Sequence, residues 1–248
     1  MNLLEQLFKW KKLKTPVDLS PVETDMHSHL IPGIDDGAPD MATVITLLDL
    51  LSQMGFKKVI TTPHIMKDLY RNSSEIILEG EAKVKEAIKE AGIPIDFKAG
   101  AEYLVDDGFT RLVEQKDLLT ISDNYLLIEL PYFSPPAQLS EILFELQLAG
   151  YKVILAHPER YAYWHGHFGR YEDLHARGLY FQLNIISLSG YYSSHIRKLS
   201  QKLIDARMID FLGTDLHSLQ YFQIMEKALL DPFLAKLVNS GRLKNPYL

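Results

Sequence analysis

The sequence predicts an α/β protein built from βα units around parallel strands. Short apolar segments typical of strands alternate with segments of helical periodicity along the whole chain. Glycines at positions 55, 92, 150 and 178 follow four of the helical segments, where the left-handed conformation ends a helix at low cost. The 248 residues suit a barrel of about 250 residues, here with about seven strands, and an open doubly wound sheet is the alternative.

The expected strands and helices follow one another in order. Seven strands are expected at Thr24–His29, Lys58–Thr62, Ile95–Ala99, Tyr125–Leu130, Lys152–Ala156, Tyr180–Ile185 and Ile209–Gly213. Six helices are expected at Met41–Met54, Ser74–Ala91, Leu139–Ala149, Arg170–Arg177, Ser194–Ala206 and Leu219–Leu230. Because no linker or low-complexity segment interrupts this pattern, residues 21–248 are expected to form one domain and residues 1–20 an N-terminal extension.

The composition excludes several classes of protein. The formal charge is −6, from 26 Lys and Arg against 32 Asp and Glu, and this mild acidic excess argues against a nucleic-acid binder. Cysteine is absent, which excludes disulfides and a cysteine nucleophile. No apolar run is long enough to predict a transmembrane helix. For the leucine- and lysine-containing residues 1–14, a docked terminal helix is favoured over a helix on a membrane surface.

Six of the expected strands deliver His, Asp or Glu at their carboxyl ends, the edge where α/β barrels place their active sites. Five of the nine histidines lie there, namely His27, His29, His64, His157 and His217. Residues i and i+2 of a strand point to the same side, so His27 and His29 can reach one ion. A single histidine would more often be structural, but this repeated placement predicts a metal site.

The donor atoms narrow the choice of metal. Imidazoles and carboxylates without sulfur suit Mn, Fe or Zn. The candidate carboxylates are Asp36, Glu102, Glu129 and Asp215, and together with the five histidines they exceed what one ion needs. Two or three ions sharing a bridging carboxylate are therefore expected, an arrangement that activates water for displacement at phosphorus.

Several residues near the expected site have both a functional and a structural interpretation. Arg160 follows His157 by three residues, where its guanidinium could bind a phosphate or form a surface ion pair. Asp36 lies in an Asp-Gly turn, which is equally typical of an ordinary loop. Aromatic residues in the loops after the strands could line a cleft or pack in the core; they are Tyr132, Phe133, Tyr161, Tyr163, Trp164, Tyr191 and Tyr192.

The segments DMHSHLIPGIDDG, TTPH, GAEY, LIELP, AHPERY and GTDLH, in this order, resemble the PHP (polymerase and histidinol phosphatase) superfamily. More closely, the chain is similar to the bacterial metal-dependent tyrosine phosphatases found with capsule and exopolysaccharide loci, over roughly residues 18–227. The resemblance implies a distorted, TIM-like (β/α)7 barrel of the PHP type. It also implies two or three divalent ions, with Mn first and Fe, Zn, Mg or Co as alternatives.

The resemblance also implies roles for individual residues. The implied metal ligands are His27, His29, Asp36, His64, Glu102, Glu129, His157, Asp215 and His217. His27 and His29 would share an ion with Asp215, and Glu102 would bridge to an ion held by His64 and His157. Asp36 and His217, with a share of Glu129 or His29, would serve the remaining position. Arg160, His217 and Asp36 are the implied catalytic residues.

One departure from the family is the absence of an arginine shortly after Asp215-Leu216-His217, since residues 218–222 read SLQYF. Arg160 remains, and Arg170 or Arg197 could also supply a cation to the phosphate. The departure places tyrosine specificity in more doubt than the metal chemistry.

The function implied by the resemblance is a cytoplasmic protein-tyrosine phosphatase, which acts by in-line attack of a metal-bound hydroxide. Its expected partner is a phosphotyrosine protein, namely a tyrosine kinase of polysaccharide export, with no nucleic acid involved. Two alternatives stay open: a small-molecule phosphatase such as histidinol phosphatase, and a non-catalytic kinase-binding protein that retains its metals. The sequence also leaves open whether the protein forms an oligomer.

Overall fold

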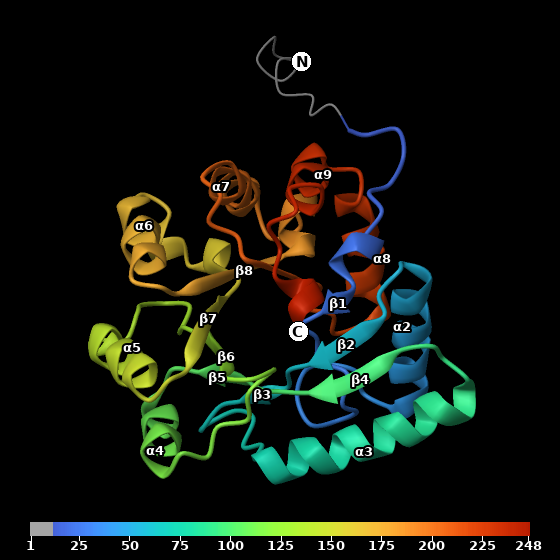
Figure 1. Cartoon of the computed structure of the whole chain (residues 1–248), viewed down its shortest axis with the longest axis horizontal. Coiled ribbons are helices and arrows are strands. Elements are labelled where there is room, and N and C mark those ends of the chain that lie inside the picture. Colours follow the sequence, from blue (N-terminus) through green and yellow to red (C-terminus); the bar gives the residue numbers. More distant parts are fainter. Residues whose placement is uncertain (1–11) are drawn as a thin grey trace.

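The computed structural model describes residues 12–248, and Figure 1 shows the strands in the interior with helices arranged around them. All paired strands are parallel, which confirms the α/β prediction. One sheet has the order β1 (Thr24–Asp25), β2 (Lys58–Thr61) and β4 (Asp96–Ala99). The other has the order β3 (His64–Ile65), β5 (Glu102–Leu104), β6 (Tyr125–Glu129), β7 (Lys152–Ala156), β8 (Tyr180–Asn184) and β9 (Phe211–Gly213).

Backbone hydrogen bonds connect the two sheets at both ends. The chain passes from β2 into β3 and from β4 into β5 after two residues, and the Glu102 N–H donates to the Pro63 carbonyl across this gap at 3.1 Å. At the other side, Ser28 forms an isolated parallel bridge with Leu216, and the Asp215 N–H donates to the His27 carbonyl at 2.7 Å. The first and last expected strands are therefore neighbours, and β3 and β5 are unpredicted extensions of the second and third.

Eight α-helices lie in the described part of the chain. They are α2 (Met41–Gln53), α3 (Ser74–Ala91), α4 (Asp107–Gln115), α5 (Leu139–Leu148), α6 (Gly169–Ala176), α7 (Ser194–Asp205), α8 (Leu219–Ala228) and α9 (Pro232–Val238). All six expected helices are present, with ends that differ by at most two residues. The expectation missed α4, of which only Phe109 is buried, and it extended α8 to Leu230, next to the separate helix α9 that begins with Pro232.

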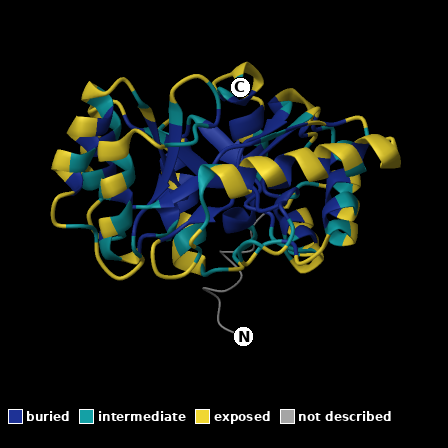
Figure 2. Cartoon of the chain, turned by 90° about the horizontal axis from the view of Figure 1, so that it is seen from below, coloured by how far each residue is buried: buried dark blue, intermediate teal, exposed yellow. Residues whose placement is uncertain are grey.

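The alternation of side chains along each strand places the site. In β6, Leu126 and Ile128 face the helices, whereas Leu127 belongs to a small cluster of apolar residues enclosed by the strands. Glu129 lies on the same side of β6 as Leu127, two residues closer to the strand's carboxyl end. Figure 2 shows the buried strands in the interior and the exposed residues on the outer faces of the helices. The enclosed cluster thus forms the apolar floor below the site.

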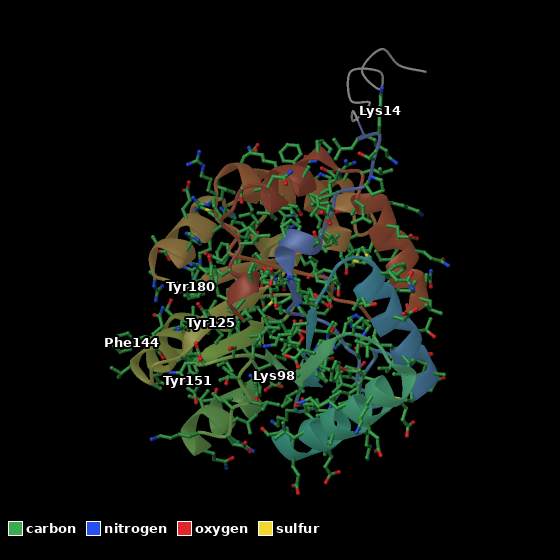
Figure 3. All side chains as sticks on the ribbon, turned by 45° about the vertical axis from the view of Figure 1, so that its right-hand side comes forward. Lys14, Lys98, Tyr125, Phe144, Tyr151 and Tyr180 are labelled. Carbon is green, nitrogen blue, oxygen red and sulfur yellow. The ribbon has the colours of Figure 1, made fainter. Side chains whose placement is uncertain are left out.

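Tyrosines close the amino-terminal end of this floor. Tyr125 and Tyr180 pack against the enclosed cluster, with ring centroids 5.4 Å apart, and Figure 3 shows them side by side. Tyr125 also contacts the Phe211 ring edge-on at 5.4 Å. The aromatic layer and the polar site therefore occupy opposite ends of the same strands.

The segment before β1 packs against the C-terminal helices. The N–H groups of Leu13 and Val17 donate to the carbonyls of Leu230 and Leu229, and Leu19 is buried. The terminal helix expected for residues 1–14 lies mostly outside the described residues, so it stays a prediction. Within residues 12–248, no helix is long and apolar enough to cross a membrane.

Candidate metal centre

All nine predicted metal ligands lie together at the carboxyl ends of the strands. They form four groups in which the candidate ligand atoms lie within 4.8 Å of one another. The groups are His29 with Asp36, His64 and His217; His27 with His29 and Asp215; His27 with Glu102 and His157; and His64 with Glu102 and Glu129. Relative to the arrangement implied by the resemblance, His157 is grouped with His27 rather than with His64, and Glu129 is grouped with His64.

Three of the imidazoles donate a hydrogen bond away from the cluster and so turn their other nitrogen toward it. His27 Nδ1 donates to Gln182 Oε1 at 2.8 Å, and His217 Nδ1 donates to the Asp215 carbonyl at 2.8 Å. His29 Nδ1 donates to Asp35 Oδ2 at 2.8 Å. This leaves the Nε2 atom of each ring facing the cluster, as metal-binding histidines require.

The inward-facing nitrogen and oxygen atoms are better placed to bind divalent cations than to form hydrogen bonds with one another. The Nε2 atoms of His27 and His29 are 3.4 Å apart, and both lie within 3.5 Å of Asp215 Oδ1. His64 Nδ1 and Glu129 Oε1 are 3.4 Å apart and buried, yet neither has a hydrogen-bond partner among the described residues. Buried polar atoms without partners are costly, and a cation among these lone pairs would remove that cost.

Glu102 is the central carboxylate. Its Oε2 lies 3.2 Å from His27 Nε2 and 3.2 Å from His64 Nδ1, and its Oε1 lies 3.0 Å from His157 Nε2. Glu102 thus belongs to two groups of candidate ligands, one with His27 and His157 and the other with His64 and Glu129. A carboxylate in this position can bridge two ions.

The pKa values of the two buried glutamates are shifted in opposite directions by the charges around them. Burial would raise the pKa of Glu102, but the imidazoles of His27 and His64 hold that pKa well below its ordinary value. Burial, and then the Glu102 carboxylate, raise the pKa of Glu129 well above its ordinary value. Added positive charge beside two buried carboxyl groups favours the ionised form of both. The charges of this cluster therefore favour the binding of cations. The buried atoms without hydrogen-bond partners lead to the same conclusion.

A cavity of about 230 Å³ opens onto the cluster. It is lined by Asp36, His64, Met66, Leu69, Tyr70, Glu102, Glu129, Tyr132, His157, Arg160, Asp215, His217 and Tyr221. Arg160 is the one Lys or Arg among these described lining residues, and its Nη1 donates to Asp215 Oδ2 at 3.2 Å. Asp36 is half-exposed at the mouth, with Oδ1 3.6 Å from His217 Nε2.

The two other arginines considered for a phosphate lie elsewhere. Arg170 pairs with Asp173 on α6, and Arg197 pairs with Asp231 across α7 and α9. Neither lines the cavity. Their contribution to phosphate binding is therefore not supported, because both lie on helices outside the cavity.

Three residues that hold the candidate ligands in place were not predicted from the sequence. Asp35 accepts hydrogen bonds from His29 and from the N–H of His64, which ties two loops together. In β8, Gln182 holds His27 and also donates to Asn184 Oδ1 at 2.8 Å, and Asn184 Nδ2 donates to Asp215 Oδ2 at 2.6 Å. The signal was the spacing of two amides on one side of an otherwise apolar strand.

The backbone at the site is held in unusual positions. His157 and Asp215 have positive φ angles of 32° and 52°, which non-glycine residues seldom adopt. At Gly213, a Cβ atom would lie 2.6 Å from Gln182 Nε2 and 2.8 Å from His27 Cβ. Only glycine allows β9 to approach His27 this closely.

These features define an α/β protein with a buried, histidine- and carboxylate-rich candidate metal centre at the carboxyl ends of its strands. The family described as "Capsular polysaccharide synthesis, CpsB/CapC" matches residues 23–224. The chain therefore belongs to the CpsB/CapC family, and the resemblance seen in the sequence is confirmed.

Individual relatives agree with this assignment. The chain is 28% identical over 197 residues to the tyrosine-protein phosphatase YwqE of Bacillus subtilis, covering 79% of this chain and 78% of the relative. It is 27% identical over 233 residues to the tyrosine-protein phosphatase CpsB of Streptococcus pneumoniae, covering 90% and 96%. A solved structure also matches, with a TM-score of 0.79 at 26% identity over 90% of each chain. It is described among "Crystal structures of YwqE from Bacillus subtilis and CpsB from Streptococcus pneumoniae, unique metal-dependent tyrosine phosphatases".

Proposed function

We propose that this protein is a metal-dependent phosphatase that hydrolyses phosphotyrosine in proteins. The observation that carries the proposal is the buried cluster of imidazoles and carboxylates with Arg160 beside it in one cavity. The relatives named as tyrosine-protein phosphatases support the same activity. The nine clustered residues would hold two or three divalent ions, with Mn the first choice and Fe, Zn, Mg or Co the alternatives.

When bound, the ions supply Lewis acidity and lower the pKa of water toward neutrality. Arg160 would bind the phosphoryl oxygens and neutralise the charge that builds up on them. Its bond to Asp215 Oδ2 holds the guanidinium at the edge of the cluster. His217 and Asp36 lie 3.6 Å apart at the cavity mouth, and whichever of the two is not bound to an ion could hold or move a proton near the leaving oxygen. A phenolate leaves readily, so their assistance need not be strong.

The fold that we propose is a distorted, TIM-like (β/α)7 barrel of the PHP type formed by residues 21–248. Within each sheet the strand order follows the chain, and Ser28 and Leu216 connect the first strand to the last. A doubly wound sheet would instead reverse its strand order at a switch point. Residues 1–20 are proposed as an extension of this single domain.

The proposed substrate is a tyrosine kinase of polysaccharide export. The family description, capsular polysaccharide synthesis, supports this partner. A kinase that uses ATP carries its phosphotyrosines on the cytoplasmic side, so the protein is proposed to act there.

The test is phosphate release from a phosphotyrosine peptide by purified protein, after chelation and again after Mn²⁺ is added back. Activity should be lost and then restored, and His27→Ala or Glu102→Ala should remove bound metal and activity together. His195→Ala is the matched control, because this histidine is exposed on α7. Retention of metal and activity by both site variants would refute the assignment.

The same assay separates the two alternatives. A kcat/KM higher for histidinol phosphate than for the peptide would favour a small-molecule phosphatase. Binding of the phosphopeptide by metal-loaded protein without release of phosphate would favour the non-catalytic reading.

A further inference from the structure

Two tyrosine rings contact the guanidinium of Arg160. The Arg160 Cζ lies over the Tyr132 ring, 4.9 Å from its centroid, and over the Tyr192 ring, 4.6 Å from its centroid. The rings come from different parts of the fold, since Tyr132 follows β6 and Tyr192 precedes α7. Cations over aromatic faces at this distance are attracted by the ring quadrupole.

The guanidinium of Arg160 is held in place, but most of its hydrogen-bond donors are not used by the described residues. Its one hydrogen bond to a described residue is the 3.2 Å contact from Nη1 to Asp215 Oδ2. An arginine carries several further N–H donors, and ring faces contact the cation without accepting these donors as an oxygen would. The remaining donors of Arg160 are therefore available to the cavity that the residue lines.

Holding the side chain in advance matters for binding an anion. A free arginine loses much rotamer freedom when a ligand fixes it, and this loss weakens binding. Because the two rings and Asp215 already restrict the Arg160 side chain, it loses little further rotamer freedom when the substrate binds. The planar donor fork is then ready for two oxygens of one phosphate.

Resting on the proposed phosphatase function, we propose that Tyr132 and Tyr192 are positioning residues that set Arg160 for the phosphoryl group. Tyr132 also stacks on the candidate ligand His157, with centroids 6.2 Å apart and an interplanar angle of 21°. Among the described residues, the Tyr192 ring contacts no candidate ligand, so Tyr192 is the cleaner position to test. Its hydroxyl is buried next to that of Tyr221, so Tyr192→Phe tests the loss of the hydroxyl apart from the loss of the ring.

The experiment measures the dissociation constant of inorganic phosphate and the kcat and KM for a phosphotyrosine peptide in metal-loaded protein. Tyr192→Leu should raise the phosphate dissociation constant and KM about tenfold, with a smaller change in kcat. Tyr192→Phe keeps the ring and should retain most of the affinity. In an Arg160→Ala background, Tyr192→Leu should have no further effect, because the ring acts through the arginine.

Tyr125→Leu is the matched control. Tyr125 carries Lys152 over its ring at 4.7 Å, at the opposite end of the strands. This variant should change thermal stability without changing the phosphate dissociation constant. Metal content and the unfolding midpoint are measured for every variant.

Three results would overturn the inference. They are additive effects of Tyr192→Leu and Arg160→Ala, an equal loss in Tyr192→Phe and Tyr192→Leu, and loss of bound metal that accounts for the change. If the wild-type protein releases no phosphate from the peptide, the proposed function fails. The cycle of phosphate dissociation constants then still decides whether the rings act through Arg160.

Discussion

Replacing Asp35 by asparagine should weaken metal binding, although Asp35 is not one of the nine proposed ligands. Its Oδ2 accepts from His29 Nδ1 at 2.8 Å and from the His64 N–H at 3.0 Å, and its Oδ1 accepts from the Gly37 N–H at 3.0 Å. Burial would lower the pKa of His29, but the Asp35 carboxylate raises that pKa well above its ordinary value. The carboxylate thus makes His29 a more basic donor and fixes the ring.

The size of the effect follows from these contacts. A partner that orients a metal-binding histidine typically contributes roughly 10–100-fold to metal affinity or activity, or about 1.4–2.7 kcal/mol. Asp35→Asn keeps an oxygen for the hydrogen bond but loses the charge, so its effect should lie in this range. Asp35→Ala loses all three contacts and leaves the His64 N–H without its acceptor, so its effect should be larger.

The assay is a Mn²⁺ titration of chelated protein, followed by activity and by the metal bound after desalting. Asp68→Asn is the control, because Asp68 is an exposed carboxylate on the next loop. Half-saturation should shift in Asp35→Asn and stay constant in Asp68→Asn. Equal titration curves for Asp35→Asn and the wild type would refute the argument that the carboxylate of Asp35 supports the centre.

Three further predictions concern stability. Chelation should lower the free energy of unfolding, and Mn²⁺ at about 100 times its dissociation constant should restore about 2.7 kcal/mol, as measured by denaturant titration. Gly213→Ala should cost about 1–3 kcal/mol and weaken metal binding, because the new Cβ meets Gln182 and His27; unchanged unfolding and metal titration would contradict this. Burial raises the pKa of Asp25 from 3.8 to about 6, even though Thr214 donates two hydrogen bonds to it. The folded state therefore holds a proton that the unfolded state releases between these pH values, and stability should fall by up to about 3 kcal/mol as pH rises through this window. Asp25→Asn should lack this component, which is visible as the difference between the two unfolding curves against pH.

Most of the ligand positions could be predicted because these residues lie in the strands or shortly after their carboxyl ends. His27 and His29 occupy alternate positions after β1, and Glu129 ends β6 on the side of Leu127. Parallel strands bring their carboxyl ends to one edge, so residues far apart in sequence meet there without any knowledge of loop conformation. The grouping of ligands was less predictable, because it depends on side-chain rotamers. Glu102 shows this by contacting three histidines with two oxygens.

Loop residues could not be placed in the same way. Asp35 and Asp36 are neighbours in one turn, yet Asp35 binds His29 from behind while Asp36 lies half-exposed at the cavity mouth. Turn composition gives no direction for either side chain. The directions of the Arg170 and Arg197 side chains could not be predicted either. Each forms an ion pair with a carboxylate in the helical layer.

The supporting residues decide what a matching set of ligands can mean. Gln182 and Asn184 alternate with Phe181 and Leu183 in β8, which places the two amides on the inner side of the strand. A search for histidines and carboxylates passes over them, although Gln182 fixes the orientation of His27 and Asn184 contacts Asp215. A chain with all nine ligands but an apolar residue at position 182 would keep the donor atoms and lose the bond that turns His27 Nε2 inward. The motif therefore predicts which atoms can bind metal, whereas polar residues on the inner sides of the strands determine whether those atoms are aimed to do so.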